Sequence, residues 1–114
     1  MGVLVDESEV KNMSDNKNTR VYISGGITNV PDYMQNFETA ESKLIKDGYE
    51  SIVNPAFVNS FLPKDFNHEE YMRVSLAMLE CCDAIYMLKG WEKSKGATEE
   101  YVYANKLGLK IIKE

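Results

Sequence analysis

Short runs of apolar residues alternate along the chain with longer segments in which apolar residues recur every three or four positions. The short runs are typical of buried strands and comprise Val21–Ile23, Tyr49–Val53, Ala84–Leu88 and Leu109–Ile112. The longer segments are typical of helices and begin near Pro31, Asn67 and Gly96. Gly48 and Gly108 are expected to end two of these helices, because glycine adopts the left-handed conformation without strain.

This alternation of strands and helices predicts a parallel sheet with right-handed crossovers. We therefore expect a three-layer α/β domain of the flavodoxin or Rossmann-like type, with about four parallel strands in the order 2-1-3-4 and helices on both faces. The domain should cover residues 20–114, after a flexible leader at residues 1–19. The sequence leaves open whether translation begins at Met1 or at Met13.

Two further expectations concern the middle of the chain. A loop should connect Asn54 to Asn67, since this stretch holds Pro63 and follows an Asn-Pro pair. The helix after Asn67 is apolar over most of its circumference, so we expect it to be well buried.

The composition is ordinary for a soluble globular domain, with 44% apolar and 27% charged residues in 114. The net charge is −5 and the arginines are limited to Arg20 and Arg73, which argues against binding to a polynucleotide. No apolar run is long enough to span a membrane and the chain begins with no secretory signal pattern, so we expect a cytoplasmic protein without a membrane partner. Cys81 and Cys82 are adjacent and only one histidine is present, so no metal site is expected.

The helical segment after Gly96 carries an acidic residue on its apolar face. The apolar stripe consists of Ala97, Tyr101, Ala104 and Leu107. Glu100 shares this stripe, whereas Glu99 should point to solvent. A carboxylate on such a stripe costs several kcal/mol unless it is paired or hydrogen-bonded. The residues alone leave two interpretations open: a structural glutamate that binds a tyrosine hydroxyl, or a functional carboxylate.

In parallel sheets, ligands bind at the carboxyl ends of the strands. The segments expected at that edge are Tyr22–Gly26, Asn54–Pro55, Leu88–Trp91 and the start of the helix near Gly96. Trp91 is expected either to stack on a base or to pack as a lid. His68 is expected to be a surface residue at a helix start, with a smaller prospect of reaching the pocket.

The run Ser94–Ala104 and the following Leu107–Ile112 resemble the signature of the nucleoside 2-deoxyribosyltransferase superfamily. That signature has a glycine four residues before a catalytic glutamate, an alanine four residues after it and a glycine before the closing strand, which correspond here to Gly96, Glu100, Ala104 and Gly108. The opening Val21–Gly26 resembles the first strand and glycine turn of that superfamily, and Asp83–Ile85 resembles the entrance to its third strand. The stretches Trp91–Ala97 and Asn54–Ala56 resemble the small DUF4406 group, whose members are often encoded by phages or prophages.

The resemblance implies cleavage or transfer at the N-glycosidic bond of a nucleoside or nucleoside 5′-monophosphate, with no cofactor. Glu100 would be the nucleophile that forms a covalent glycosyl–enzyme intermediate, kept ionised by the helix dipole. Tyr22 would orient Glu100, and Asp83 would act near the leaving base or the sugar. The implied substrate-binding residues are Ser24, Gly25, Gly26, Asn54, Trp91, Ser94, Gly96 and Ala97.

One position separates the transferases from related enzymes. Ser94 stands six residues before Glu100, where the transferases usually carry aspartate and the related nucleoside 5′-monophosphate N-glycosidases carry serine. Ser94 therefore either helps to bind a 5′-phosphate or only caps the helix. Thr28 occupies the place of a basic residue of those glycosidases. The alternative to an enzyme is a non-catalytic nucleotide-binding module that serves as a sensor, sponge or regulator.

The apolar surface predicted for this chain exceeds what one thin sheet can cover. The helix after Asn67 and the Phe57–Phe66 segment supply the excess. The Phe57–Phe66 segment is expected either to shape the substrate site or to face another subunit. The resembled superfamily also builds its pockets at subunit contacts, so we expect a homodimer or a higher homo-oligomer. In the alternative, residues 3–13 fold over the helix and cover it.

Overall fold

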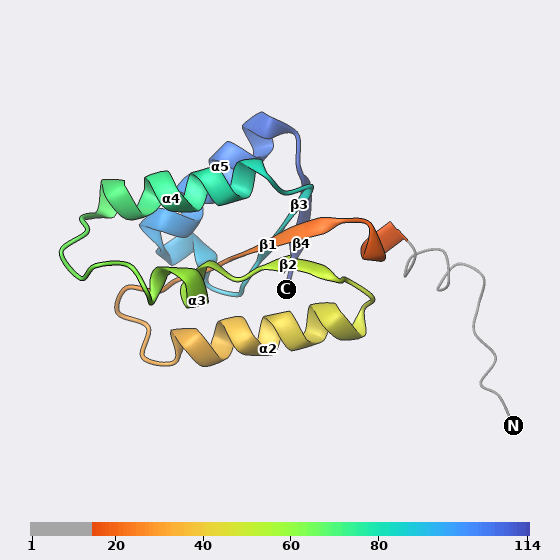
Figure 1. Cartoon of the computed structure of the whole chain (residues 1–114), viewed down its shortest axis with the longest axis horizontal. Helices are drawn as coiled ribbons and strands as arrows, with labels where there is room; N and C mark the ends of the chain where they lie inside the picture. The colour runs from red at the N-terminus through yellow and green to blue at the C-terminus, as the bar shows by residue number, and fades with distance from the viewer. Residues whose placement is uncertain (1–14) are drawn as a thin grey trace, which may run out of the picture.

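Residues 15–114 are described by the computed structural model, in which helices cover both faces of a four-stranded sheet (Figure 1). The strands are β1 (Arg20–Ser24), β2 (Ser51–Val53), β3 (Ala84–Met87) and β4 (Lys110–Lys113). Their order is β2-β1-β3-β4 and all three neighbouring pairs are parallel. The predicted three-layer α/β fold and its strand order are therefore confirmed. The leader lies outside the described residues up to residue 14, as does the predicted cover by residues 3–13.

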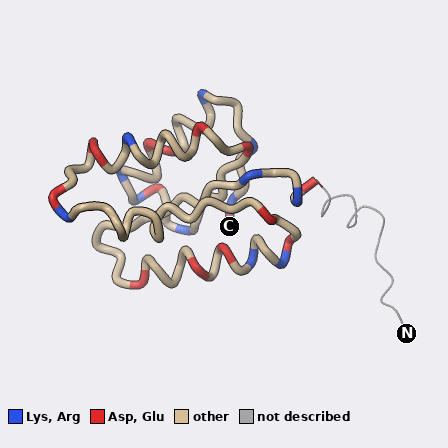
Figure 2. The backbone as a smooth tube through the Cα atoms, viewed as in Figure 1, with Lys and Arg blue, Asp and Glu red and all other residues tan. Residues whose placement is uncertain are grey.

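The helices form the two outer layers. They are α2 (Tyr33–Lys46), α3 (Pro55–Asn59), α4 (His68–Glu80), the 3₁₀ helix η1 (Trp91–Lys93) and α5 (Lys95–Leu107). Helices α2 and α3 pack on one face of the sheet, and α4 and α5 pack on the other (Figure 1). None of the described helices combines the length and apolarity that crossing a membrane requires. Both signs of charge occur on each of α2, α4 and α5, and the strands carry charges only at their ends (Figure 2).

The central strand β1 determines which side chains reach each face of the sheet. Val21 and Ile23 join the core under α2, while Tyr22 joins the core under α4 and α5, and all three are fully buried. Ser24 lies two residues after Tyr22 and so points to the same face. The four residues of β3 are buried as well, as expected for a strand covered on both sides.

The predicted helix ends are confirmed by their geometry. Asn67 and Glu70 form a reciprocal capping box at the start of α4. Gly48 and Gly108, after α2 and α5, have positive φ angles of 99° and 76°. The start of α4 is therefore fixed by local hydrogen bonds, and this fixes the position of His68, its first residue.

Two predictions about the middle of the chain are wrong. The segment after Asn54 begins with helix α3, because the Asn54 side chain accepts the backbone N–H of Phe57 and Pro55 occupies the first turn. Helix α4 buries only one face, formed by Met72, Ser75 and Leu79. The helix contacts the sheet and α5 along one side only. Ala77 is therefore exposed, and the larger remaining apolar residues of the helix are half-buried: Tyr71, Val74, Leu76 and Met78.

We predict that Gly25→Ala lowers the free energy of unfolding by about 1–3 kcal/mol, as overpacking does. A Cβ at Gly25 would lie 2.6 Å from Cδ1 and 2.9 Å from Cβ of Leu88. The matched control is Gly96→Ala, whose Cβ would make an ordinary 3.4 Å contact with Met72 Sδ. Because alanine favours helices over glycine by up to about 1 kcal/mol, this control should be neutral or stabilising. Urea titrations of both variants measure the difference, and equal stability of Gly25→Ala and wild type would contradict the prediction.

Candidate active site

A cavity of about 440 Å³ lies at the carboxyl edge of the sheet. Residues after β1, the start of α5 and parts of α2, α3 and α4 line it: Tyr22, Gly25, Ile27, Thr28, Tyr33, Phe37, Pro55, Ala56, Asn59, Ser60, Phe66, His68, Tyr71, Met72, Ser75, Ser94, Gly96, Ala97 and Glu100. The strand order reverses between β1 and β3, and ligands of open α/β sheets bind at this position. The volume is typical of a site for a small molecule.

Glu100 forms part of the cavity wall and is held from two sides. Its side chain is nearly buried, at 6% exposure, because α5 turns this residue toward β1 together with Ala97 and Ala104. The Tyr22 hydroxyl donates a hydrogen bond to Oε2, and the Ser24 hydroxyl donates one to Oε1 at 2.7 Å. One strand thus supplies a donor to each oxygen of the carboxylate.

The protonation of Glu100 differs from the sequence expectation. Burial raises the pKa of the Glu100 carboxyl from 4.5 to about 7, while the hydrogen bonds from Tyr22 and Ser24 oppose the rise and the charge of Glu99 adds to it. The prediction that the helix dipole keeps Glu100 ionised is wrong. Glu100 lies in the second turn of α5, and the dipole acts within the first turn. Near neutral pH the Glu100 carboxyl is therefore protonated to a greater extent than an ordinary glutamate.

Tyr22 remains a hydrogen-bond donor over the whole neutral range. Burial and the neighbouring Glu100 charge raise the pKa of the Tyr22 hydroxyl well above its usual value, although a hydrogen bond from Ser75 lowers it. Ser75, Tyr22, Glu100 and Ser24 thus form one chain of polar contacts across α4, β1 and α5.

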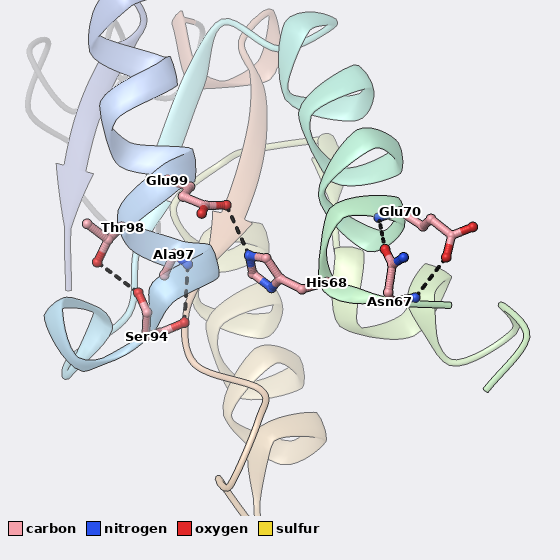
Figure 3. A network of polar contacts seen from close by, with 7 residues as sticks. All are labelled: Asn67, His68, Glu70, Ser94, Ala97, Thr98 and Glu99. Carbon is pink, nitrogen blue, oxygen red and sulfur yellow. Dashed lines mark hydrogen bonds and ion pairs between the residues drawn. The ribbon is translucent and has the colours of Figure 1, made fainter. Parts of the chain in front are cut away.

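Several of the predicted binding residues line the same cavity. Gly25, Gly96 and Ala97 form backbone-rich parts of its wall. Ser94 also lines it and caps α5, because its hydroxyl oxygen accepts the N–H of Ala97 at 3.1 Å (Figure 3). Its carbonyl oxygen accepts the Thr98 hydroxyl at 2.8 Å. The cap predicted for Ser94 is confirmed, and the residue also borders the cavity.

Asp83 does not join Glu100 and Tyr22, so the prediction that the three converge is wrong. It directly precedes β3, and its carboxylate accepts the backbone N–H of Arg20 at 2.9 Å, where β1 begins. Because β1 and β3 are parallel, this contact lies at the amino edge of the sheet, opposite the cavity. Asp83 ties the starts of two strands together.

Four predicted binding residues also lie off the cavity wall: Ser24, Gly26, Asn54 and Trp91. Ser24 contacts the cavity only through its hydrogen bond to Glu100. The Trp91 ring packs against Tyr101, with 4.5 Å between ring centroids. Packing was one of the two expectations for Trp91, the other being stacking on a base. Asn54 caps α3 and borders a separate surface hollow beside Glu41. A Cβ at Gly26 would meet Val30 at 3.2 Å and Ser94 at 3.7 Å, so this glycine allows the turn after β1 to approach Ser94.

The sequence reasoning missed several residues of the cavity. Ser75 is a polar residue on the buried stripe of α4, and the same spacing argument that singled out Glu100 detects it. Asn59 lies on α3, which was predicted as a loop, and its Oδ1 atom is buried without a hydrogen-bond partner in the described structure. The aromatic rings of Tyr33 and Tyr71 give no sequence signal that distinguishes them from core residues, whereas Phe66 belongs to the Phe57–Phe66 segment that the sequence placed beside the pocket.

His68 lines the cavity, although the sequence favoured a surface position for it. Glu99, which was expected to point to solvent, contacts another side chain. The two side chains meet between α4 and α5, with 3.1 Å between His68 Nε2 and Glu99 Oε2 (Figure 3). His68 lines the cavity, whereas Glu99 does not. This contact joins the start of α4 to the first turns of α5 beside the cavity.

A Rossmann-like α/β domain with a buried carboxyl in a small-molecule cavity defines the class of the protein. Its residues 19–113 match the family model of the domain of unknown function DUF4406, and the chain belongs to this family. The matched range contains all four strands and every residue that lines the cavity. No curated protein gives a significant match to the sequence.

We predict that Glu100 destabilises the fold as the pH rises. The pKa of Glu100 is about 7 in the folded state and 4.5 in the unfolded state. Between these pH values the folded state therefore binds more protons than the unfolded state. The free energy of unfolding consequently falls as the pH rises from 4.5 to beyond 7. The full loss amounts to at most about 3 kcal/mol. Glu100→Gln, which stays neutral, should gain stability relative to wild type between pH 5 and pH 8. Denaturant titrations of both proteins at pH 5 and pH 8 test this. The prediction would be contradicted if the difference in unfolding free energy between Glu100→Gln and wild type were the same at both pH values.

Proposed function

We propose that the protein cleaves or transfers the N-glycosidic bond of a nucleoside or nucleoside 5′-monophosphate, in the manner of the nucleoside 2-deoxyribosyltransferase superfamily that it resembles. The observation that carries this proposal is the carboxyl of Glu100, held in the wall of a 440 Å³ cavity by one hydroxyl on each oxygen. A carboxylate in this setting is oriented for attack on a carbon atom and is poorly solvated.

The reaction proceeds through Glu100 as nucleophile. One carboxylate oxygen attacks the anomeric carbon C1′, the C1′–N bond breaks, and its electron pair passes to the base, which takes up a proton. Water or a second base then attacks C1′, so the ester bond to Glu100 breaks and the carboxylate is regenerated. Tyr22 and Ser24 hold the carboxylate at a fixed angle throughout. Its negative charge also stabilises the positive charge that develops on the sugar.

The lining of the cavity supports a nucleoside-like substrate. The rings of Tyr33, Phe66 and Tyr71 offer apolar faces for a base. Asn59 adds a polar side chain to the cavity wall. The Ser94 oxygen accepts from Ala97, which leaves the hydroxyl proton for a 5′-phosphate at the start of α5.

A second candidate function is a binding module on the same fold that performs no chemistry. The position of Asp83 at the opposite edge of the sheet favours it, since the acidic residue implied for the leaving base is not at the cavity. Base release from a nucleotide panel separates the two functions, because a binder raises the thermal midpoint with its ligand but releases no base.

We predict that Glu100→Gln reduces base release from ribo- and deoxyribonucleosides and their 5′-monophosphates by about 10³-fold or more. The nucleophile must be ionised, so wild-type kcat/KM should rise as the pH increases toward about 7. Chromatography of the free base measures both effects. Glu92→Gln, an exposed change on η1, is the control and should retain full activity. An active Glu100→Gln variant would contradict the role of Glu100.

We further propose that the protein works as a homodimer or a higher homo-oligomer. On α3 and just after it, Phe57 and Phe61 are 54% and 76% exposed and pack edge to face, an apolar surface unusual for a monomer. Light scattering at micromolar concentration should give at least twice the 13.0 kDa of one chain. Phe61→Asp should shift the particles toward monomers without unfolding them. An active wild-type monomer of 13.0 kDa would contradict the proposal.

A further inference from the structure

The proposed reaction requires a proton for the departing base, and the described structure offers one group suited to give it. Asp83 lies at the far edge of the sheet. Apart from tyrosines, His68 and Glu100 are the ionisable side chains among the described residues that line the cavity. Since Glu100 is the nucleophile, His68 remains as the donor, and imidazole is the commonest general acid at neutral pH.

The surroundings of His68 suit a proton donor. Its Nε2 contacts the Glu99 carboxylate at 3.1 Å, so the carboxylate orients the ring (Figure 3). No described residue forms a hydrogen bond with Nδ1, and the His68 side chain lines the cavity. The side chains of His68 and Glu99 are 42% and 40% exposed, which allows the ring to recover a proton from water.

Helix α5 and the start of α4 place His68 and Glu100 at one cavity. His68 lies beside Gly96, with Cε1 3.8 Å from the point that a Cβ would occupy. Gly96 and Glu100 are four residues apart and so lie on the same side of α5. Because His68, Gly96 and Glu100 all line the cavity, a sugar with C1′ at Glu100 can present its base toward His68.

We propose that His68 is the general acid that protonates the leaving base and that Glu99 is its positioning residue, an inference that rests on the proposed function. As the C1′–N bond breaks, its electron pair takes the proton from Nδ1 of the His68 imidazolium. In the second step the neutral imidazole accepts a proton from the attacking water, C1′ is released from Glu100, and the imidazolium is restored. Protons and electrons balance over the cycle, and no further reactant is needed.

The test compares two leaving groups on the same sugar. One substrate is a nucleoside that the wild type cleaves, and the other is the 4-nitrophenyl β-glycoside of its sugar, whose phenolate departs without a proton. His68→Gln should lower kcat on the nucleoside by about 100-fold or more and on the nitrophenyl glycoside by less than tenfold. Glu100→Gln should abolish both reactions. Glu99→Gln should lower kcat on the nucleoside by about tenfold with little change in KM.

Controls separate this inference from the proposed function and from misfolding. Glu69→Gln, an exposed change in the first turn of α4, should match the wild type on both substrates. The thermal midpoint of each variant reports its folding. If His68→Gln unfolds, Glu99→Gln still tests the inference, because that variant retains the His68 side chain. Equal losses on both substrates for the His68 and Glu99 variants would overturn the acid role while leaving Glu100 as nucleophile. Wild type without activity on any nucleoside or glycoside would overturn the proposed function and this inference together.

Discussion

The burial of one carboxyl group between two hydroxyls of β1 is the constraint on which the arrangement of the site depends. Glu100 is nearly withdrawn from water, and the donors Tyr22 and Ser24 compensate this only in part, since the pKa of the carboxyl still rises to about 7. An apolar residue of similar volume would avoid the desolvation cost of a buried charge. The fold therefore retains an ionisable group at some cost in stability, which is typical of functional sites and unusual for a purely structural glutamate.

The fold could be predicted well because local rules agree with one another along this chain. The capping box of Asn67 and Glu70 and the left-handed glycines set the helix ends, and the right-handed crossover rule then leaves few possible strand orders. Glu100 could be found because a polar residue on an apolar stripe conflicts with the surrounding pattern. Ser75 shows the same conflict on α4, and the prediction overlooked it because a serine is a weaker signal than a charged residue.

The remainder of the site depends on contacts that sequence spacing does not determine. Asp83 was placed at the cavity from the resemblance, but in a parallel sheet a residue just before a strand lies at the edge opposite to a residue just after one. The contact between His68 and Glu99 joins residues that are 31 positions apart on two helices. Its formation depends on how α4 and α5 pack against each other.

The two ionisable groups that the proposed reaction employs lie in opposite environments, and this contrast suits their tasks. Glu100 exchanges a covalent bond with the sugar and needs no proton from water during a cycle, so burial behind Tyr22 and Ser24 does not impede it. An acid must recover its proton in every cycle, and the exposed His68–Glu99 pair has access to solvent for this purpose. A buried nucleophile and an exposed acid therefore divide the two steps of the reaction between two environments. Because both groups contact α5, rotation or displacement of that single helix would disturb them together.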